Sequence, residues 1–152
     1  MKKLLLILLT IFIVVGCGKK GKFIHTIKSQ NDMPTAIAKL EKLIKDANLT
    51  HFETIDHSAN AKSVGMRLKP ESVVVFGNPK MGTVLMECNP SIGIDLPLKI
   101  LFNTNYEGDT FITYTNPEYW SLKHNIKDVK CLDIIQKAKV ALANLAKLSG
   151  EK

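Results

Sequence analysis

The sequence predicts an α+β fold with two layers, in which a mostly antiparallel sheet is covered by two amphipathic helices. Two observations carry this prediction. Apolar residues recur at helical spacing near both ends of the domain, and short apolar runs separated by turn residues lie between them. Residues 17–152 number 136, which is enough for one domain with its own hydrophobic core.

A strand and a long helix are expected first. Residues 23–28 alternate between apolar and polar side chains, which is typical of a strand. The run Asn31-Asp32-Met33-Pro34 indicates a helix start, with a capping carboxylate or amide followed by proline in the first turn. The helix should end near Asn48. Its apolar face is predicted to contain Ile37, Leu40, Leu43, Ile44 and Ala47.

Two strands, a short helical turn and a long loop are expected next. Residues 51–56 indicate a strand, and residues 59–64 a helical turn closed by Gly65. Residues 73–76 are continuously apolar, which is typical of a strand buried on both faces. From Gly77 to Pro97, Gly, Asn and Pro recur every few positions, so we expect a rigid loop that folds back beside this strand.

The sequence of the last third of the chain predicts a hairpin and two helices. Residues 99–103 and 110–115 should pair around a turn at 106–109. Residues 118–123 indicate a short helix, and we interpret its Trp120 as a core residue rather than a stacking platform. A long final helix should begin near Asp128 and stop at Gly150. Its apolar face is predicted to contain Cys131, Ile134, Ala138, Leu142, Leu145 and Leu148.

The N-terminal residues resemble a bacterial lipoprotein signal. Lys2 and Lys3 precede an apolar run of 12 residues, interrupted only by Thr10, and Gly16 stands before Cys17. The run is too short to span a bilayer, which takes about 20 residues in a helix. The resemblance implies a signal peptide at 1–16, fatty acylation of Cys17 (with palmitate, for example), a lipidated tether at 17–21 and a single domain at 22–150.

This resemblance also predicts where the protein works and what it meets. A periplasm-facing lipoprotein is expected, on the outer membrane rather than the inner one, because Gly18 and not aspartate follows Cys17. The formal charge is +7, yet an exported and anchored domain does not normally meet nucleic acid. Lys19, Lys20 and Lys22 either attract anionic lipid or form a solvated linker.

The segment from Val73 to Lys99 closely resembles the bacterial domain of unknown function 302 family. The matching motifs are Phe76-Gly77-Asn78-Pro79-Lys80, Gly82-Thr83, Leu85-Met86, Asn89-Pro90 and Asp95-Leu96-Pro97-Leu98-Lys99, with Ile55-Asp56-His57 before them and Tyr114, Asn116-Pro117 and His124 after them. The resemblance covers residues 33–126. It implies a small α+β domain similar to the TATA-box-binding-protein-like arrangement, often self-associating, and no established activity. Cys88 departs from the family pattern.

Five polar residues are candidates for ligand binding: His57, Asn78, Lys80, Thr83 and Asp95. A loop fixed by Gly and Pro can present such groups to a polar or anionic ligand. The structural alternative is that the asparagines bond nearby backbone and that Asp95 caps a turn. We expect the loop to bring His57 close to Asp95.

Sulfur atoms provide weaker candidates for a metal site. Met81, Met86 and Cys88 lie within eight residues, and soft ligands of this kind select Cu(I). Methionine is also a common core residue. Cys88 and Cys131 either pair in the oxidising periplasm or remain free, with Cys131 acting as a small hydrophobe.

The sequence favours a protein that binds a ligand or partner over an enzyme. It contains no G-x-S-x-G elbow and no H-E-x-x-H helix. The alternatives are a small-molecule or metal-dependent enzyme that uses His57 and Asp95, a copper-binding protein, and a structural protein of the envelope. A homo-oligomer is also expected from the family resemblance, and no cofactor is indicated.

Overall fold

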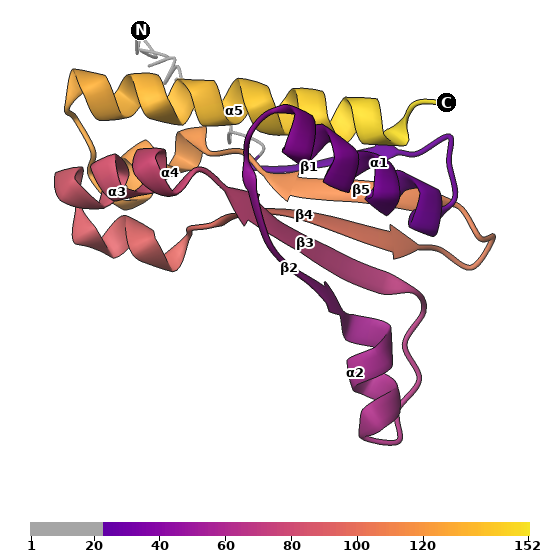
Figure 1. The fold of residues 1–152 in the computed structure, drawn as a ribbon. Helices are drawn as coiled ribbons and strands as arrows, with labels where there is room; N and C mark the ends of the chain where they lie inside the picture. The colour runs from indigo at the N-terminus through magenta and orange to yellow at the C-terminus, as the bar shows by residue number, and fades with distance from the viewer. Residues whose placement is uncertain (1–22) are drawn as a thin grey trace, which may run out of the picture.

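The computed structural model describes residues 23–152 and shows the predicted α+β fold (Figure 1). The predicted signal peptide at 1–16, Cys17 and the predicted tether at 17–21 lie outside the described residues. The elements, in chain order, are β1 (Ile24–Lys28), α1 (Met33–Asp46), β2 (Thr50–Asp56), α2 (His57–Ser63), β3 (Glu71–Gly77), α3 (Pro79–Cys88), the 3-10 helix η1 (Pro90–Ile94), β4 (Leu98–Thr104), β5 (Thr110–Thr115), α4 (Glu118–Lys123) and α5 (Val129–Gly150).

The five strands form one antiparallel sheet in the order β1-β5-β4-β3-β2. Strand β1 lies at one edge of the sheet and pairs with β5, whereas β2 to β5 follow one another as neighbours. The register between β2 and β3 shifts because His51 pairs with Phe76 and Glu53 with Val75. Phe52 therefore has no partner on β3, as in a β-bulge.

Helices α1 and α5 pack side by side on one face of the sheet (Figure 1). Both helices begin at the predicted positions, and each has a capping carboxylate. The Asp32 carboxylate accepts a hydrogen bond from the Thr35 N–H at 2.9 Å, and the Asp128 carboxylate accepts one from the Cys131 N–H at 3.0 Å. Each cap satisfies a backbone donor that the first helical turn leaves unpaired.

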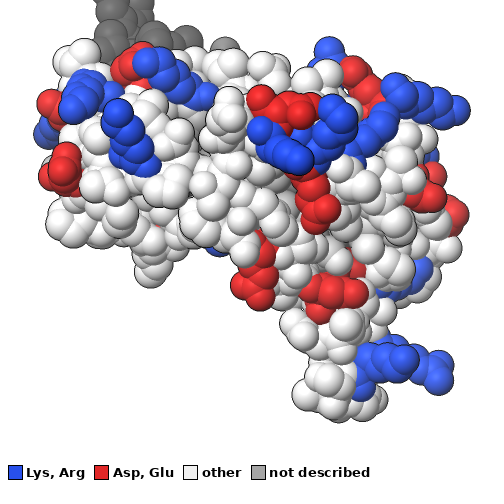
Figure 2. Space-filling model, viewed as in Figure 1, with Lys and Arg blue, Asp and Glu red and all other residues white. Residues whose placement is uncertain are grey.

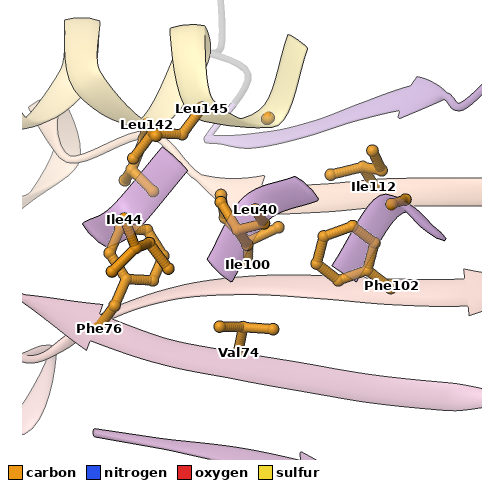
Figure 3. Packing of buried hydrophobic residues seen from close by; sticks show 11 residues of the cluster. Leu40, Ile44, Val74, Phe76, Ile100, Phe102, Ile112, Leu142 and Leu145 are labelled. Atoms are coloured by element: carbon orange, nitrogen blue, oxygen red, sulfur yellow. The ribbon is translucent and has the colours of Figure 1, made fainter. Parts of the chain in front are cut away.

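The main core lies between this helical layer and the sheet (Figure 3). Leu40 and Ile44 of α1 and Leu142 of α5 point toward the central strands, which confirms the predicted face of each helix at these positions. Leu145 is buried as predicted, while Ile37 is only half-buried. Ile134 is buried in a second core cluster, where it packs with Leu85, Ile92 and Trp120 instead of against the sheet. Leu148 was predicted on this face and is instead exposed, because Ser149 and Gly150 pack inward at the end of α5.

Two predictions about the central region are wrong. Strand β3 is fully buried on one face only, because Val74 and Phe76 face the core while Val73 and Val75 are half-exposed on the other side. The expected loop at 77–97 consists largely of helices, namely α3 and η1. Asn78 and Asn89, followed by Pro79 and Pro90, are N-caps with proline in the first turn, a helix-start pattern rather than a turn pattern.

Within residues 23–152, every helix is too short or too polar to cross a bilayer.

Candidate functional site

An apolar cavity of about 490 Å³ lies where α3 faces α5. Met81 and Leu85 of α3 form one wall and Ile134 of α5 another, and Trp120 of α4 and Leu96 also line the cavity. The remaining lining residues are Leu49, Phe52, Gly77, Asn78, Pro79, Gly82, Thr83, Met86, Gly93, Pro97, Leu98, Lys137, Ala138 and Ala141. This volume is typical of sites for small organic molecules.

Small residues keep the cavity open. Gly82 of α3 and Ala138 and Ala141 of α5 stand on its walls, where larger side chains would occupy the space. The β-bulge supplies another wall, because the unpaired Phe52 lines the cavity from strand β2. The sequence therefore forms the cavity by placing small residues on facing helices and a bulge at the sheet edge.

The cavity offers little polarity to a ligand. Asn78 and Thr83, two of the predicted binding residues, line it, but both side chains already have backbone partners. The Asn78 Oδ1 accepts the Met81 N–H at 3.2 Å, and the Thr83 Oγ1 donates to the Pro79 carbonyl at 2.9 Å. Lys137 is the one charged residue among those that line the cavity, and its Nζ lies 2.5 Å from Asp133 Oδ2. The walls of the cavity are thus almost entirely apolar, and Lys137 is the one cation among the lining residues.

A disulfide joins the two helices that form the cavity. Cys88, the last residue of α3, is bonded to Cys131 in the first turns of α5, with a Cα–Cα distance of 6.7 Å. The alternative of a free Cys131 packed as a small hydrophobe does not hold, although the residue is fully buried. The bond ties the end of α3 to α5.

The disulfide also bears on the sulfur candidates for a metal. With Cys88 bonded to Cys131, neither sulfur is a thiolate, the form that binds metal. Met81 and Met86 line the apolar cavity. The ligand atoms of Cys88, Cys131 and Asp128 lie within 4.8 Å of one another, the only such group found in the described part of the chain. A metal there requires reduction of the disulfide first.

A polar cluster centred on Asp95 lies beside the cavity wall, since the next residue, Leu96, lines the cavity. Asp95 Oδ2 lies 2.5 Å from His124 Nε2. Its Oδ1 accepts hydrogen bonds from the Tyr119 hydroxyl at 2.7 Å and the Lys123 ammonium at 3.0 Å. The opposite ring nitrogen of His124, Nδ1, lies 2.7 Å from Ser91 Oγ. The cluster connects η1 and the segment after it to helix α4.

The three donors keep Asp95 ionised. Burial raises the pKa of its carboxyl, but the hydrogen bonds from Tyr119, His124 and Lys123 outweigh that effect, and the pKa lies below its ordinary value. Burial and the neighbouring carboxylate raise the pKa of Tyr119. The hydrogen bond to Asp95 raises the pKa of Lys123.

The Ser91, His124 and Asp95 side chains form a continuous chain of hydrogen bonds. With Nε2–H donating to Asp95, Nδ1 of His124 is an acceptor for the Ser91 hydroxyl. His124 is buried, while Ser91 is exposed. A nucleophile, a base and a group that orients the base show this order of contacts.

The predicted convergence of His57 and Asp95 is wrong. His57 begins α2 at the end of the β2–β3 hairpin where Asp56 pairs with Ser72, whereas α3 and η1 follow the opposite end, at Gly77 (Figure 1). The expectation failed because it treated 77–97 as a loop able to fold back along the strand.

The other predicted residues fall into two groups. Asn78, Lys80 and Thr83 all belong to α3, and Lys80 is exposed and forms no ion pair with another described residue. Asp95 joins the polar cluster, whose members Ser91, Tyr119 and Lys123 are not among the predicted binding residues. His124 is a predicted residue only as part of the family motif. Contacts between residues 24 to 33 positions apart depend on tertiary packing, and no local pattern signals them.

The open antiparallel sheet with helices on one face defines the molecule as a small α+β domain. A family model described as a domain of unknown function, DUF302, matches residues 25–146. The chain belongs to the DUF302 family. It is also similar to a solved structure, the uncharacterised conserved DUF302 protein from Bacillus stearothermophilus, with a TM-score of 0.74 and 19% identity, over 84% of this chain and 98% of that one. At 19% identity, this similarity shows that the two proteins share a fold.

Curated relatives are found in Brucella. The chain is 32% identical over 101 residues to a protein named fluoride-specific ion channel FluC 1 from Brucella suis biovar 1 (strain 1330), covering 66% of this chain and 40% of that protein. A protein of the same name from Brucella abortus biovar 1 (strain 9-941) shows the same identity over 66% of this chain and 37% of its own length. The chain thus spans about two fifths of the length of these relatives.

Proposed function

We propose that this chain is a lipid-anchored envelope protein whose DUF302 domain binds a single acyl chain, such as that of a fatty acid, in the cavity between α3 and α5. The observation that supports it is the cavity of about 490 Å³, with walls that are almost entirely apolar. Each buried methylene contributes about 0.8 kcal/mol of transfer free energy, so ten give about 8 kcal/mol before the costs of ordering.

The character of the walls favours a flexible chain over a rigid ring. Met81 and Met86 contribute unbranched, adaptable side chains to one wall. Lys137 stands among the lining residues as the single cation, where it can meet the carboxylate of a fatty acid. A molecule with a long apolar body and one anionic end therefore uses every feature of the cavity.

The membrane anchor supports the same ligand class by placing the domain beside a source of acyl chains. The anchor is inferred from the lipobox-like residues that end at Cys17. The Brucella relatives are named as ion channels, and channels work in membranes, which agrees with a domain used next to a bilayer.

The anchor and the ligand are tested separately. Mass spectrometry of the detergent-extracted full chain should show a mature N-terminus at an acylated Cys17. The variant Cys17→Ser should remain uncleaved or be mislocalised. An unmodified N-terminus, or one at Met1, contradicts the anchor and leaves the binding proposal intact.

Ligand binding is measured with residues 23–152, which contain every described strand and helix. The matched Bacillus stearothermophilus chain, covered over 98% of its length, consists almost wholly of this fold. Palmitate, kept below its aggregation concentration, should raise the melting temperature, and butyrate should not. Ala141→Trp fills the cavity and should abolish the effect, whereas Ala143→Trp, exposed on the same helix, should preserve it. Equal stabilisation of both variants contradicts the site.

A second candidate function is ester hydrolysis at Ser91, supported by the bonded chain of Ser91, His124 and Asp95. In that reaction the Ser91 Oγ attacks the ester carbonyl while His124 Nδ1 takes the hydroxyl proton. The proton then passes to the leaving alcohol, and water releases the acyl group as the free acid. A fluorophosphonate should label the wild type and Ser63→Ala but not Ser91→Ala. Absence of labelling on Ser91 in the wild type contradicts this function.

A further inference from the structure

Helix α2 and the segment after it form an arm that projects from the β2–β3 hairpin (Figure 1). The helix has no buried residue, and residues 62–68 are all exposed. Three apolar side chains stand in this segment, with exposed fractions of 71% for Val64, 67% for Met66 and 47% for Leu68. Three such residues within five positions, on a projecting tip, form a concentrated apolar surface.

The fold fixes the base of the arm and leaves its tip free. At the base, the Asp56 carboxylate accepts the Ala59 N–H at 2.9 Å, and Ser58 Oγ accepts the Glu71 N–H at 3.1 Å. At the tip, Gly65 turns the chain with a φ of +75°, a conformation that favours glycine. The apolar side chains beyond this turn are held out from the domain and do not contribute to its core.

Cationic residues stand next to these apolar side chains in the sequence. Lys62 and Arg67 are exposed and form no ion pair with another described residue. The Lys69 Nζ lies 3.3 Å from the ring centroid of Tyr106, itself 91% exposed, and 2.9 Å from the Asn105 carbonyl oxygen. Figure 2 shows the positive side chains at the end of the arm, with acidic side chains nearer its base. The tip is therefore apolar and positively charged at once.

We propose that this tip, defined as residues 62–69, docks on an anionic lipid surface. Val64, Met66 and Leu68 would enter the boundary between headgroups and acyl chains, and Lys62 and Arg67 would meet the lipid phosphates. Apolar residues flanked by Lys and Arg bind membrane interfaces in this way. The charge is what favours lipid over a second copy of this chain, because two such tips repel each other. The inference goes beyond acyl-chain binding and does not depend on it.

The test uses residues 23–152, which lack the lysines of the tether as well as Cys17. Because Cys88 and Cys131 are paired, a cysteine introduced by Met66→Cys is the single free thiol and can carry the fluorophore NBD. The control carries NBD through Val129→Cys, at a residue 81% exposed at the start of α5. Vesicles of phosphatidylglycerol mixed with phosphatidylcholine are compared with vesicles of phosphatidylcholine alone.

NBD at position 66 should brighten and shift to the blue with the anionic vesicles, and NBD at position 129 should not change. Lys62→Gln combined with Arg67→Gln should weaken this binding about tenfold or more. Lys127→Gln combined with Lys130→Gln removes the same charge from exposed positions outside the arm and should have a much smaller effect.

Three results would overturn the proposal. The first is an equal response at positions 66 and 129, which indicates general adsorption. The second is an equal response to both kinds of vesicle. The third is a shift at position 66 that occurs without lipid and grows with protein concentration, which identifies a second copy of the chain as the partner.

Discussion

The imidazole of His124 lies 2.5 Å from the carboxylate of Asp95 and connects the end of helix α4 to the segment that follows η1. The histidine is buried, so its ring nitrogens depend on protein partners rather than on water. Ser91 provides the second partner. The pair therefore holds together the part of the domain that contributes Leu96 and Trp120 to the cavity lining.

Asp95→Asn should lower the free energy of unfolding at pH 7 by about 1–3 kcal/mol, because a buried histidine loses a charged acceptor. Urea denaturation of residues 23–152 measures this difference. Asp133→Asn serves as the control, since Asp133 is an exposed carboxylate paired with Lys137 on the surface of α5, and it should change stability by less than about 0.5 kcal/mol. Equal effects would show that Asp95 has no special structural role.

The pKa of Asp95 predicts a dependence on pH. Its pKa is lower in the folded protein than in the unfolded chain, so its contribution is complete above the unfolded value of about 3.9. The contribution is lost as the pH falls through the lower folded pKa. Wild-type stability should thus fall more steeply below about pH 4 than that of Asp95→Asn. Identical slopes in urea melts across this range would contradict the assignment.

Reduction of the Cys88–Cys131 disulfide should destabilise the domain by about 2–4 kcal/mol, because the bond closes a loop between residues 43 positions apart. The same treatment should weaken palmitate binding, since the bond ties α3 to α5 at the cavity. The double variant Cys88→Ser with Cys131→Ala should behave like the reduced protein and should not respond to reductant. Thermal melts with and without dithiothreitol make the comparison.

Alanine substitutions along helix α5 should differ in how much they lower the free energy of unfolding. Leu142→Ala, and Leu40→Ala on α1, should each cost about 2–5 kcal/mol, because both side chains are almost completely enclosed. Leu148→Ala should cost far less, since this leucine is 47% exposed. Denaturant melts that rank Leu148→Ala with the other two would show that the last turns of α5 pack differently.

Local signals in the sequence are sufficient to predict the two layers of this fold. The capping residue Asp32 indicates one helix start and the position of Asp128 the other, and the apolar spacing after each predicts the buried face of the helix. Asn78 and Asn89 carried the same kind of signal, yet the glycines nearby favoured a loop. Proline directly after asparagine fits a turn and a helix start equally well, and only packing of Leu85 and Ile92 into the second core cluster decides between them.

The cavity and the polar cluster around Asp95 could not be predicted from local signals in this way. The cavity depends on how close α3 comes to α5, a distance that the sequence does not encode locally. The sequence predicts Asp95 as a candidate for ligand binding, but its partner His124 is 29 positions away and the expected partner His57 lies at the other end of the sheet. Pairing of Cys88 with Cys131 was left open for the same reason.

Lys137→Met should weaken recognition of the carboxylate of the proposed ligand and leave recognition of its apolar chain unchanged. The substitution removes the one charge among the lining residues and keeps a long apolar side chain, so binding of uncharged 1-hexadecanol should be unchanged. Palmitate binding at pH 8 should weaken about fivefold, which corresponds to the roughly 1 kcal/mol of an exposed charge pair.

Asp133→Asn should strengthen palmitate binding, because Asp133 competes for the same ammonium at 2.5 Å. Lys130→Met, on α5 but outside the cavity lining, is the control and should affect neither ligand. If Lys137→Met and Lys130→Met bind palmitate as the wild type does, the carboxylate does not lie at Lys137 and the ligand is recognised by its apolar part alone.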